Sequence, residues 1–559
     1  MRLLTDPVAR SGPAAFLLLW AAAVFVLVPE MWRMGWSGNE VNYFDLAWAH
    51  FHPELSGPDH AVRDASQARV ASFAVIGSLI NLFGFDGAKL ALLALCLPAL
   101  ALGYSLMARA FHLSLAGATV ALVLFVATPQ SLFGQEWLFQ GVEAKVLAYV
   151  FIFPGLAVAW SDGAATRMFP AFAAALCLAL ATWMHFLVGG FWMLVVLGMF
   201  ALGRKGARGR RMAVFFAIYL LLTAPLVWII LSERMAGGTP DMAGLSMTLN
   251  QIYAVFRNPH HLAPFVSMGE FAHTWFPGVL MAAVIAALAF GLARQDLSQA
   301  RDRRLMLLVA CLNLYLVLAV CLAFLDRETQ RFGMFYMFRP GSLILLLSFM
   351  AGLRWITARL SDGSGQAAPQ KVRRPMLRPV LAAFLLAGAW VAPQYLMLGY
   401  NLAHQPVPDL AHSLSAEDAE LVAWMRRSTP PEALFLIAPA KGDMRSDADM
   451  PRLGLERLSQ RATLVNWKFV PTTPSEIIRW YRLLQLRQQV FAGDCAALGQ
   501  LPASRPVDYL VIERNGDGAA RDGLQDCTRP VWSNARYRVL QTLSAEKALA
   551  AVPSGTVAR

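Results

Sequence analysis

Two carboxylates, Glu40 and Asp45, are the residues best placed to do chemistry. They lie in the stretch Gly38–Ala47 (GNEVNYFDLA), which follows the first apolar run and opens a polar loop that extends to about residue 69. A carboxylate beside a membrane can act as a general base on a hydroxyl when partial burial raises its pKa. On a helix, acids at positions 40 and 45 lie on different faces, so the spacing does not imply a shared metal site. The alternative role for Glu40 is that of a solvated acid at the end of a span.

Basic residues in later loops are candidates for binding phosphate. Arg257 and Arg331 could form paired hydrogen bonds with phosphate oxygens, and contact with lipid headgroups is the alternative. His260 and His261 could bind an anion when protonated, or a metal, although adjacent histidines can also simply lie at the membrane interface. Arg339 has apolar neighbours on both sides, which predicts a position inside a span, where charged groups tend to mark function.

Three further polar residues are expected in the same set. Glu143 and Lys145 form a Glu-x-Lys motif just before an apolar run, so the acid could pair with Lys145 or meet Arg339. His185, followed by Gly189 and Gly190, indicates a tight turn between two spans. We therefore predict Glu40 and Asp45 as catalytic residues and these polar groups as substrate- or phosphate-binding residues: Glu143, Lys145, His185, Arg257, His260, His261, Arg331 and Arg339.

The elements that would position these residues are membrane-spanning helices. The 559 residues are 57% hydrophobic and only 15% charged, whereas soluble domains contain about a quarter charged residues. Apolar runs long enough to span a bilayer recur up to about residue 400. Residues 70–85 are apolar but short, and we expect them at the interface. About eleven spans follow, at 14–30, 88–108, 113–128, 146–160, twice within 168–202, and at 212–231, 275–292, 305–325, 335–353 and 379–399.

The charge pattern predicts how the chain crosses the membrane. The formal net charge of +12 gathers in the loops 204–211, 294–304 and 354–378, and basic loops lie on the cytoplasmic side. This places the N-terminus in the cytoplasm and the candidate residues on the outer face of a bacterial inner membrane, with the first span retained. No basic face carries interleaved aromatics, which argues against nucleic-acid binding. The oligomeric state is left open by the sequence.

We predict an all-α polytopic membrane domain at 1–400, with a functional outer loop at 31–69, and a periplasmic α/β domain at 401–559. Two of the six cysteines, Cys495 and Cys527, lie in this tail, and in an oxidising compartment we expect them to form a disulfide. The tail is predicted to contain helices at 415–427 and 475–490 and strands at 433–437, 462–467, 508–513 and 536–543.

This layout resembles the GT-C superfamily of membrane glycosyltransferases, whose first outer loop is functional. The aminoarabinose and protein-mannosyl branches begin that loop with a pattern like Asp-Glu-x-x-Tyr-x-x-x-Ala. Glu40, Tyr43 and Ala47 match this pattern, and Asn39 replaces its first acid. The chain also resembles a group of bacterial multi-span proteins of unassigned reaction with a GT-C-like layout. The shared motifs read here as Glu143-Ala144-Lys145, Arg257-Asn258-Pro259-His260-His261 and Asn466-Trp467-Lys468.

The resemblance implies a glycosyltransferase that uses a sugar carried on a polyprenyl phosphate. The donor lipid would lie between spans among membrane lipids, its phosphate would meet Arg or His residues, and Glu40 would accept a proton from the acceptor hydroxyl. Some relatives use a divalent metal, so a metal is a possible cofactor. Two other functions fit the sequence: a non-catalytic scaffold for envelope polysaccharide assembly, and a transporter of a lipid-linked solute. The transporter is disfavoured because no repeat of spans is found.

Overall fold

The structure is a computed structural model. It describes residues 7–9, 12–32, 36–53, 67–134, 136–160, 168–202, 208–295, 300–362, 389, 391–399, 414–439, 443–445, 455–468, 470–501, 506–514 and 523–543. The chain forms two compact units, and each is described by itself below. The helical unit contains 1–33, 89–228 and 258–407, and the mixed unit contains 34–88, 229–257 and 408–559. The mixed unit thus combines the predicted first outer loop with the C-terminal tail.

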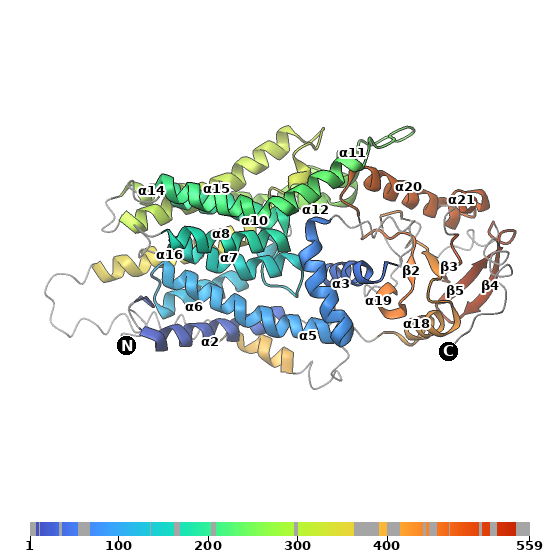
Figure 1. The fold of residues 1–559 in the computed structure, drawn as a ribbon, viewed down its shortest axis with the longest axis horizontal. Helices are drawn as coiled ribbons and strands as arrows, with labels where there is room; N and C mark the ends of the chain where they lie inside the picture. Colours follow the sequence, from blue (N-terminus) through green and yellow to red (C-terminus); the bar gives the residue numbers. More distant parts are fainter. Residues whose placement is uncertain are drawn as a thin grey trace. The chain divides into compact units, whose positions relative to one another are not determined.

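The helical unit is built from long apolar helices. Figure 1 shows these helices running roughly side by side. The described residues include six helices long and apolar enough to cross a membrane, and four shorter apolar helices. The main helices are α2 Gly12–Met31, the second part of α5 Val70–Ala110, α6 Leu115–Ala127, α7 Ala144–Trp160, α8 Phe169–Met184, α9 Phe186–Ala201, most of α10 Arg208–Ala236, α14 Phe276–Arg294, α15 Ala300–Leu325 and α16 Gly341–Asp362.

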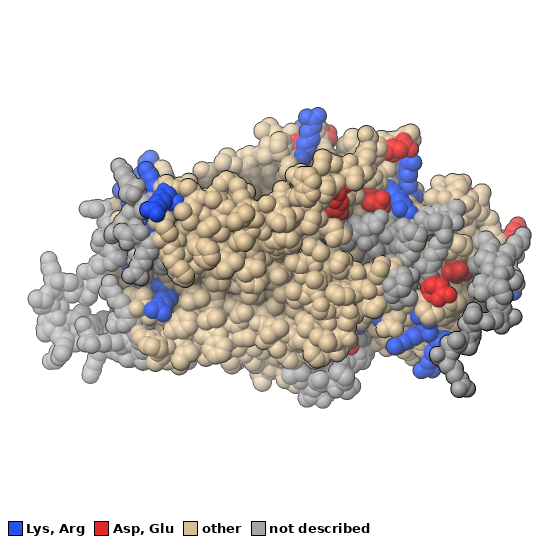
Figure 2. Space-filling model, in the orientation of Figure 1, with Lys and Arg blue, Asp and Glu red and all other residues tan. Residues whose placement is uncertain are grey.

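The outer faces of these helices are apolar, as a lipid environment requires. Leu221 and Trp228 of α10 and Leu288 of α14 are more than half exposed. Figure 2 shows a broad surface almost free of charged side chains over these helices, with Lys and Arg gathered near one end. The chain is therefore a multi-pass membrane protein. The predicted total of eleven spans is not established, because span 379–399 falls largely outside the described residues.

Within the helical unit, loops predicted to share one side of the membrane meet. Arg301 donates to the carbonyls of Ala110 and Trp160, and Arg354 donates to the His112 carbonyl. Arg354 also makes two 3.0 Å hydrogen bonds to the carboxylate of Asp302. All of these loops were predicted to be cytoplasmic, and the loops predicted to lie outside meet in the separate cluster described below.

Three details of the helical unit concern predicted elements. The chain breaks at His185 between α8 and α9, which confirms the predicted turn within 168–202. Residues 70–85 form the start of α5, which is kinked at Gly84 (φ 70°), and they belong to the mixed unit. The prediction that Arg339 lies inside a span was wrong. Helix α16 begins at Gly341, because Pro340 has no N–H to donate and is favoured just before or at the start of a helix.

The mixed unit is organised around a five-stranded sheet with strand order β2-β1-β3-β5-β4. Strands β2 Ala462–Thr463, β1 Leu434–Ile437 and β3 Tyr509–Glu513 are parallel, whereas β5 Tyr537–Thr542 and β4 Thr528–Ser533 are antiparallel. Strand β4 was not predicted, because Pro530 and the exposed side chains of this segment break the apolar pattern. The other elements are α3 Gly38–Phe51, α11 Leu249–Gln251, the π-helix Ile252–Arg257, α18 Ala416–Ser428, α19 Leu455–Ser459, α20 Pro474–Phe491 and α21 Cys495–Gly499.

Alternation along the strands gives the sheet two buried faces. Tyr509, Val511, Tyr537 and Val539 pack on one face with Leu421 of α18. Ser415 caps α18 by accepting from the Asp418 N–H, at the predicted start of this helix. The structure joins Cys495 of α21 to Cys527, which precedes β4. This bond joins α21 to the segment that leads into β4, the edge strand of the sheet.

Candidate active site

The helical unit contains a buried ionic cluster centred on Glu136. The Glu136 carboxylate accepts hydrogen bonds from Lys145 Nζ at 2.8 Å and from Arg339 Nε at 3.2 Å. His261 Nδ1 lies 3.7 Å from the same carboxylate. Lys145 also lies 3.3 Å from Glu143, so it bridges two acids. The side chains of Glu136, Glu143 and Lys145 are at most 5% exposed, so their charges are screened little by water.

Short backbone contacts hold the loop that carries Glu136. Gln130 accepts hydrogen bonds from the Leu138 and Phe139 N–H groups, and Ser342 at the start of α16 donates to the Glu136 carbonyl. Gly134 adopts φ +59°, and a Cβ there would lie 3.0 Å from Phe338. The Gly134 carbonyl contacts His261 Nδ1. The loop is therefore fixed from several elements, which is what a preorganised site requires.

The cluster shifts the pKa values of its two acids in opposite directions. Burial by itself raises the pKa of Glu136, but the charges of Lys145 and Arg339 outweigh burial and hold its pKa well below the ordinary value. The pKa of Glu143 is raised, mainly by burial and also by Glu136, against the opposing effect of Lys145. Burial lowers the pKa of His261 to about 4, so this imidazole is neutral near pH 7. Glu136 is thus a fixed anion, and Glu143 takes up a proton more readily than an ordinary glutamate.

Arg339 connects this cluster to a small apolar cavity. Its Nη1 lies 3.1 Å from His185 Nε2, and its guanidinium stacks over the Tyr336 ring at 3.9 Å. The cavity of about 40 Å³ has room for only a few water molecules. Besides Arg339, Tyr336 and Pro340, its lining is mainly apolar and aromatic: Tyr149, Leu187, Val188, Phe191, Trp192, Tyr315 and Phe335. The Arg339 guanidinium therefore lies at the edge of the apolar lining of this cavity.

The mixed unit holds the two predicted catalytic acids on α3. Ser37 caps this helix in a capping box, because its hydroxyl accepts from the Glu40 N–H and Glu40 Oε2 accepts from the Ser37 N–H at 2.8 Å. Glu40 is 2% exposed, so it is a buried acid with a structural role and not the solvated acid of the alternative prediction. Asp45 is 1% exposed on the same helix and takes no part in the cap.

The tail reaches the start of α3 within the mixed unit. Lys468 Nζ donates to Asn39 Oδ1 at 2.9 Å, and Arg257 donates to the Lys468 carbonyl at 2.8 Å. The Arg257 guanidinium also lies over the Trp467 ring, 5.1 Å from its centroid. Three segments distant in sequence, namely the first loop, the segment before α12 Pro259–Leu262 and the tail, thus converge beside Glu40.

The predicted site residues therefore fall into two groups. The helical unit brings together Glu143, Lys145, His185, His261 and Arg339. The His260 ring lies beside that of His261 in a tilted arrangement, with 4.1 Å between the ring centroids. Arg331 is exposed, and no described contact joins its side chain to the cluster. The mixed unit holds the remaining three: Glu40, Asp45 and Arg257.

The sequence prediction missed two residues of these groups. Glu136 is absent from the predicted site residues, although it precedes the Glu-x-Lys motif in the same outer loop. Lys468 was noted only as part of the Trp-Lys motif. A position in a loop shared with a predicted site residue was the only signal for Glu136, because the partner Arg339 is far away in the chain.

The described donor groups do not gather as metal ligands. Among the residues that the structure describes, no three His, Cys, Asp or Glu side chains gather closely enough to hold a metal ion. The Glu136 carboxylate is instead occupied by Lys145 and Arg339. No step proposed below uses a metal.

Comparison with known proteins identifies the fold. Among solved structures, arabinofuranosyltransferase AftD from Mycobacteria matches with a TM-score of 0.53 and 14% sequence identity, over 96% of this chain and 40% of that chain. A mutant form of AftD matches with a TM-score of 0.54 and 14% identity, over 96% of this chain and 42% of that chain. The chain has the GT-C fold. The predicted resemblance is therefore confirmed at the level of the fold.

Other comparisons add little to the GT-C assignment. ArnT from Cupriavidus metallidurans bound to undecaprenyl phosphate matches with a TM-score of 0.45 and 13% identity, over 95% of this chain and 98% of that chain. A family model described as Domain of unknown function (DUF6798) matches residues 416–486, from α18 into α20. No protein of curated function matches the sequence. The chain spans less than half the length of the AftD structures that it matches.

Proposed function

We propose that this protein is a membrane glycosyltransferase that moves a sugar from a polyprenyl-phosphate donor to an envelope acceptor on the periplasmic face. The observation that carries the proposal is the Glu136 cluster, where Lys145 and Arg339 are held by one ionised acid beside an apolar-lined cavity. The GT-C fold supports the same class of protein, since AftD is an arabinofuranosyltransferase.

The charge of the cluster suits a phosphodiester. Lys145 and Arg339 are cationic, Glu136 is anionic, and His261 is neutral, so one positive charge is left uncompensated when Glu143 is protonated. A polyprenyl-phosphate sugar carries one negative charge at its phosphate. Fixed donors in a water-poor site stabilise such a charge strongly as it grows on the leaving phosphate. Arg339 would meet the phosphate, and the aromatic lining would meet the first apolar atoms of the lipid.

The acids of α3 are proposed to act on the acceptor. Glu40, or Asp45 in its place, takes the proton from the acceptor hydroxyl, whose oxygen attacks the anomeric carbon of the donor sugar. The bond from that carbon to the phosphate oxygen breaks with inversion, and the electron pair leaves with the polyprenyl phosphate. The atoms balance without a further reactant. The burial of both acids on one helix is the feature that supports this role.

The domain assignment and orientation complete the proposal. Residues 1–400 form the membrane domain and 401–559 a periplasmic domain, with the N-terminus in the cytoplasm of a bacterial inner membrane. The Cys495–Cys527 disulfide supports an oxidising location for the tail. Gathering of Lys and Arg near one end of the helices supports a cytoplasmic side there.

Native mass spectrometry of the gently extracted protein tests the donor class. We expect a retained polyprenyl phosphate or polyprenyl-phosphate sugar, which is lost in Lys145→Met and Arg339→Met. Arg331→Met is the matched control, because it removes an exposed cation outside the cluster and should leave the bound lipid unchanged. Retention of bulk phospholipid alone, or equal loss in all three variants, would contradict the proposal.

A further inference from the structure

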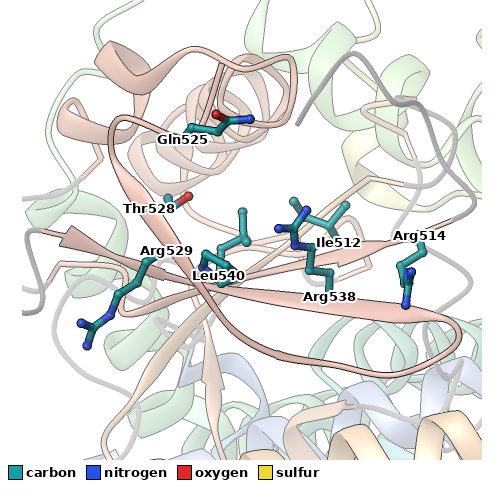
Figure 3. A pocket seen from close by; sticks show the side chains of 8 residues that line it. Ile512, Arg514, Gln525, Thr528, Arg529, Arg538 and Leu540 are labelled. Atoms are coloured by element: carbon teal, nitrogen blue, oxygen red, sulfur yellow. The ribbon is translucent and has the colours of Figure 1, made fainter. Parts of the chain in front are cut away.

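A cavity on the C-terminal sheet, far in sequence from the predicted site residues on α3, has the features of a ligand site. Its volume is about 300 Å³, at the lower end for small-molecule pockets. Ile512 of β3, Arg538 and Leu540 of β5, and Thr528 and Pro530 of β4 line it from the sheet, and Gln525 lines it from the segment before β4 (Figure 3). All of these residues belong to the mixed unit.

Strand register places these side chains on one face. Ile512 pairs with Arg538 and Pro530 pairs with Leu540, and paired residues on neighbouring strands point to the same side of a sheet. The opposite face carries Tyr537 and Val539 in the packed core. The cavity therefore has an apolar floor of Ile512 and Leu540, and its lining also includes three arginines: Arg514, Arg529 and Arg538 (Figure 3).

Arg538 is the one guanidinium directed into this cavity. Figure 3 shows the guanidinium groups of Arg514 and Arg529 turned away from it. Arg514 donates to the Asn534 carbonyl, and Arg529 donates to Gln541 on the other face. Arg538 is half-buried and makes no ion pair or side-chain hydrogen bond among the described residues. The described residues that line the cavity include arginines but no acid.

Two polar side chains, Thr528 and Gln525, line the cavity together with Arg538. The Thr528 hydroxyl donates to the Leu524 carbonyl, so its oxygen presents lone pairs as an acceptor. The Gln525 amide, which offers both donors and an acceptor, lies across the cavity from the sheet. The Cys495–Cys527 bond anchors this segment, and Cys527 N–H donates to the Leu524 carbonyl at 3.3 Å. The polar side of the cavity is thus held in place.

We infer that this cavity binds one anionic sugar unit, a sugar that carries a carboxylate or a phosphate. Arg538 would grip the oxyanion, because a guanidinium presents paired donors to two oxygens. Ile512 and Leu540 would pack under the C–H face of the ring, and Gln525 and Thr528 would bond its hydroxyls. A simple inorganic anion would leave the apolar floor unused. The site is independent of the proposed transfer reaction, and it would stand if the chain transferred no sugar.

Binding to the full-length protein in nanodiscs tests the inference. The probes are glucuronate, glucose 1-phosphate, glucose and inorganic phosphate, each titrated by calorimetry and saturation-transfer NMR. We expect saturable binding of at least one of the two acidic sugars, and the stronger of the two identifies the oxyanion. Glucose and inorganic phosphate should each bind at least about tenfold more weakly, because each lacks one half of the recognition. Equal binding of glucose, or of inorganic phosphate alone, would overturn the inference.

Two variants locate the binding in this cavity. Arg538→Gln should weaken binding about tenfold or more. Arg427→Gln, which changes an exposed arginine of α18 that does not line the cavity, should change binding less than twofold. Gln525→Trp fills the cavity from an exposed position and should abolish binding while the fold is retained. Unchanged affinity in Gln525→Trp overturns the inference even if Arg538→Gln fails to fold.

Discussion

Arg339 and Glu136 lie 203 positions apart in the chain, yet Arg339 Nε donates to Glu136 Oε1 at 3.2 Å inside the helical unit. The Arg339 side chain is 14% exposed and that of Glu136 is 3% exposed. Removal of either partner leaves the other charge buried and less well compensated. The pair therefore links α16 to the loop before α7, and it gives the proposed phosphate site its rigidity.

A double-mutant cycle measures this link. Arg339→Met and Glu136→Gln should each cost about 3–5 kcal/mol of stability, because one buried charge loses its partner. The double variant should lose less than the sum by roughly 0.5–3 kcal/mol. Thermal unfolding in detergent, with Arg331→Met as the exposed control, gives the comparison. Strict additivity of the two changes would show that the pair is not coupled.

His261 predicts a pH dependence of stability. Its pKa falls from 6.5 to about 4 in the folded protein, so between these values the unfolded chain binds a proton that the folded chain does not. The contribution of His261 is fully present above pH 6.5, and it is lost as the pH falls towards 4, by roughly 2–3 kcal/mol. His261→Asn should make the melting temperature less dependent on pH over this range. His260→Asn should leave that pH dependence unchanged. A parallel pH profile in wild type and His261→Asn would contradict the assignment.

Glu40→Gln separates the chemical role of this residue from its structural role. A glutamine at this position still completes the capping box with Ser37, so α3 should keep its stability while proton acceptance is lost. Ser37→Ala is the inverse control, and it should cost about 1 kcal/mol of stability yet retain transfer. Transfer of radiolabelled sugar by purified protein gives the readout. If Glu40→Gln remains active and Asp45→Asn does not, the base is Asp45.

The contact between Lys468 and Asn39 predicts that the tail steadies the first loop. Lys468→Met removes a 2.9 Å hydrogen bond and should speed amide exchange across the first turn of α3. Asn39→Asp turns the contact into an ion pair at the start of a helix, where an acid is favoured, and should slow that exchange. Hydrogen-exchange mass spectrometry of full-length protein measures both. Equal exchange in all three proteins would mean that the contact does not stabilise the loop.

The Cys495–Cys527 bond closes a loop with a sequence separation of 32 residues. Loss of the bond in a Cys495→Ser/Cys527→Ser variant should cost about 2–4 kcal/mol, since the unfolded tail gains freedom. Serine at Cys311, an exposed cysteine of α15 without a disulfide, is the matched control and should change little. Chemical unfolding followed by tail fluorescence reports the difference. A variant as stable as wild type would place the bond outside the folded core.

The sequence by itself determined the class of the protein and most of its elements. Local rules predict the break at His185, the start of α18 after Ser415, and helix α20. Turns, helix caps and apolar periodicity each depend on residues close together in the sequence. Strand β4 escaped the same rules, since its pairing with β5 and not its own apolar pattern makes it a strand.

Only the tertiary structure decided which charged groups meet. Glu143 and Arg339 were both expected at the site, but the acid that binds Arg339 is Glu136. The bond between Glu40 and Ser37, by contrast, lies within one helical turn and follows the local Ser-x-x-Glu pattern of a capping box. No local pattern encodes the pair of Glu136 and Arg339, because a long side chain has many possible partners until burial fixes one. The charges on a helix end can be read from the sequence, but the partner that sets their pKa is chosen by packing.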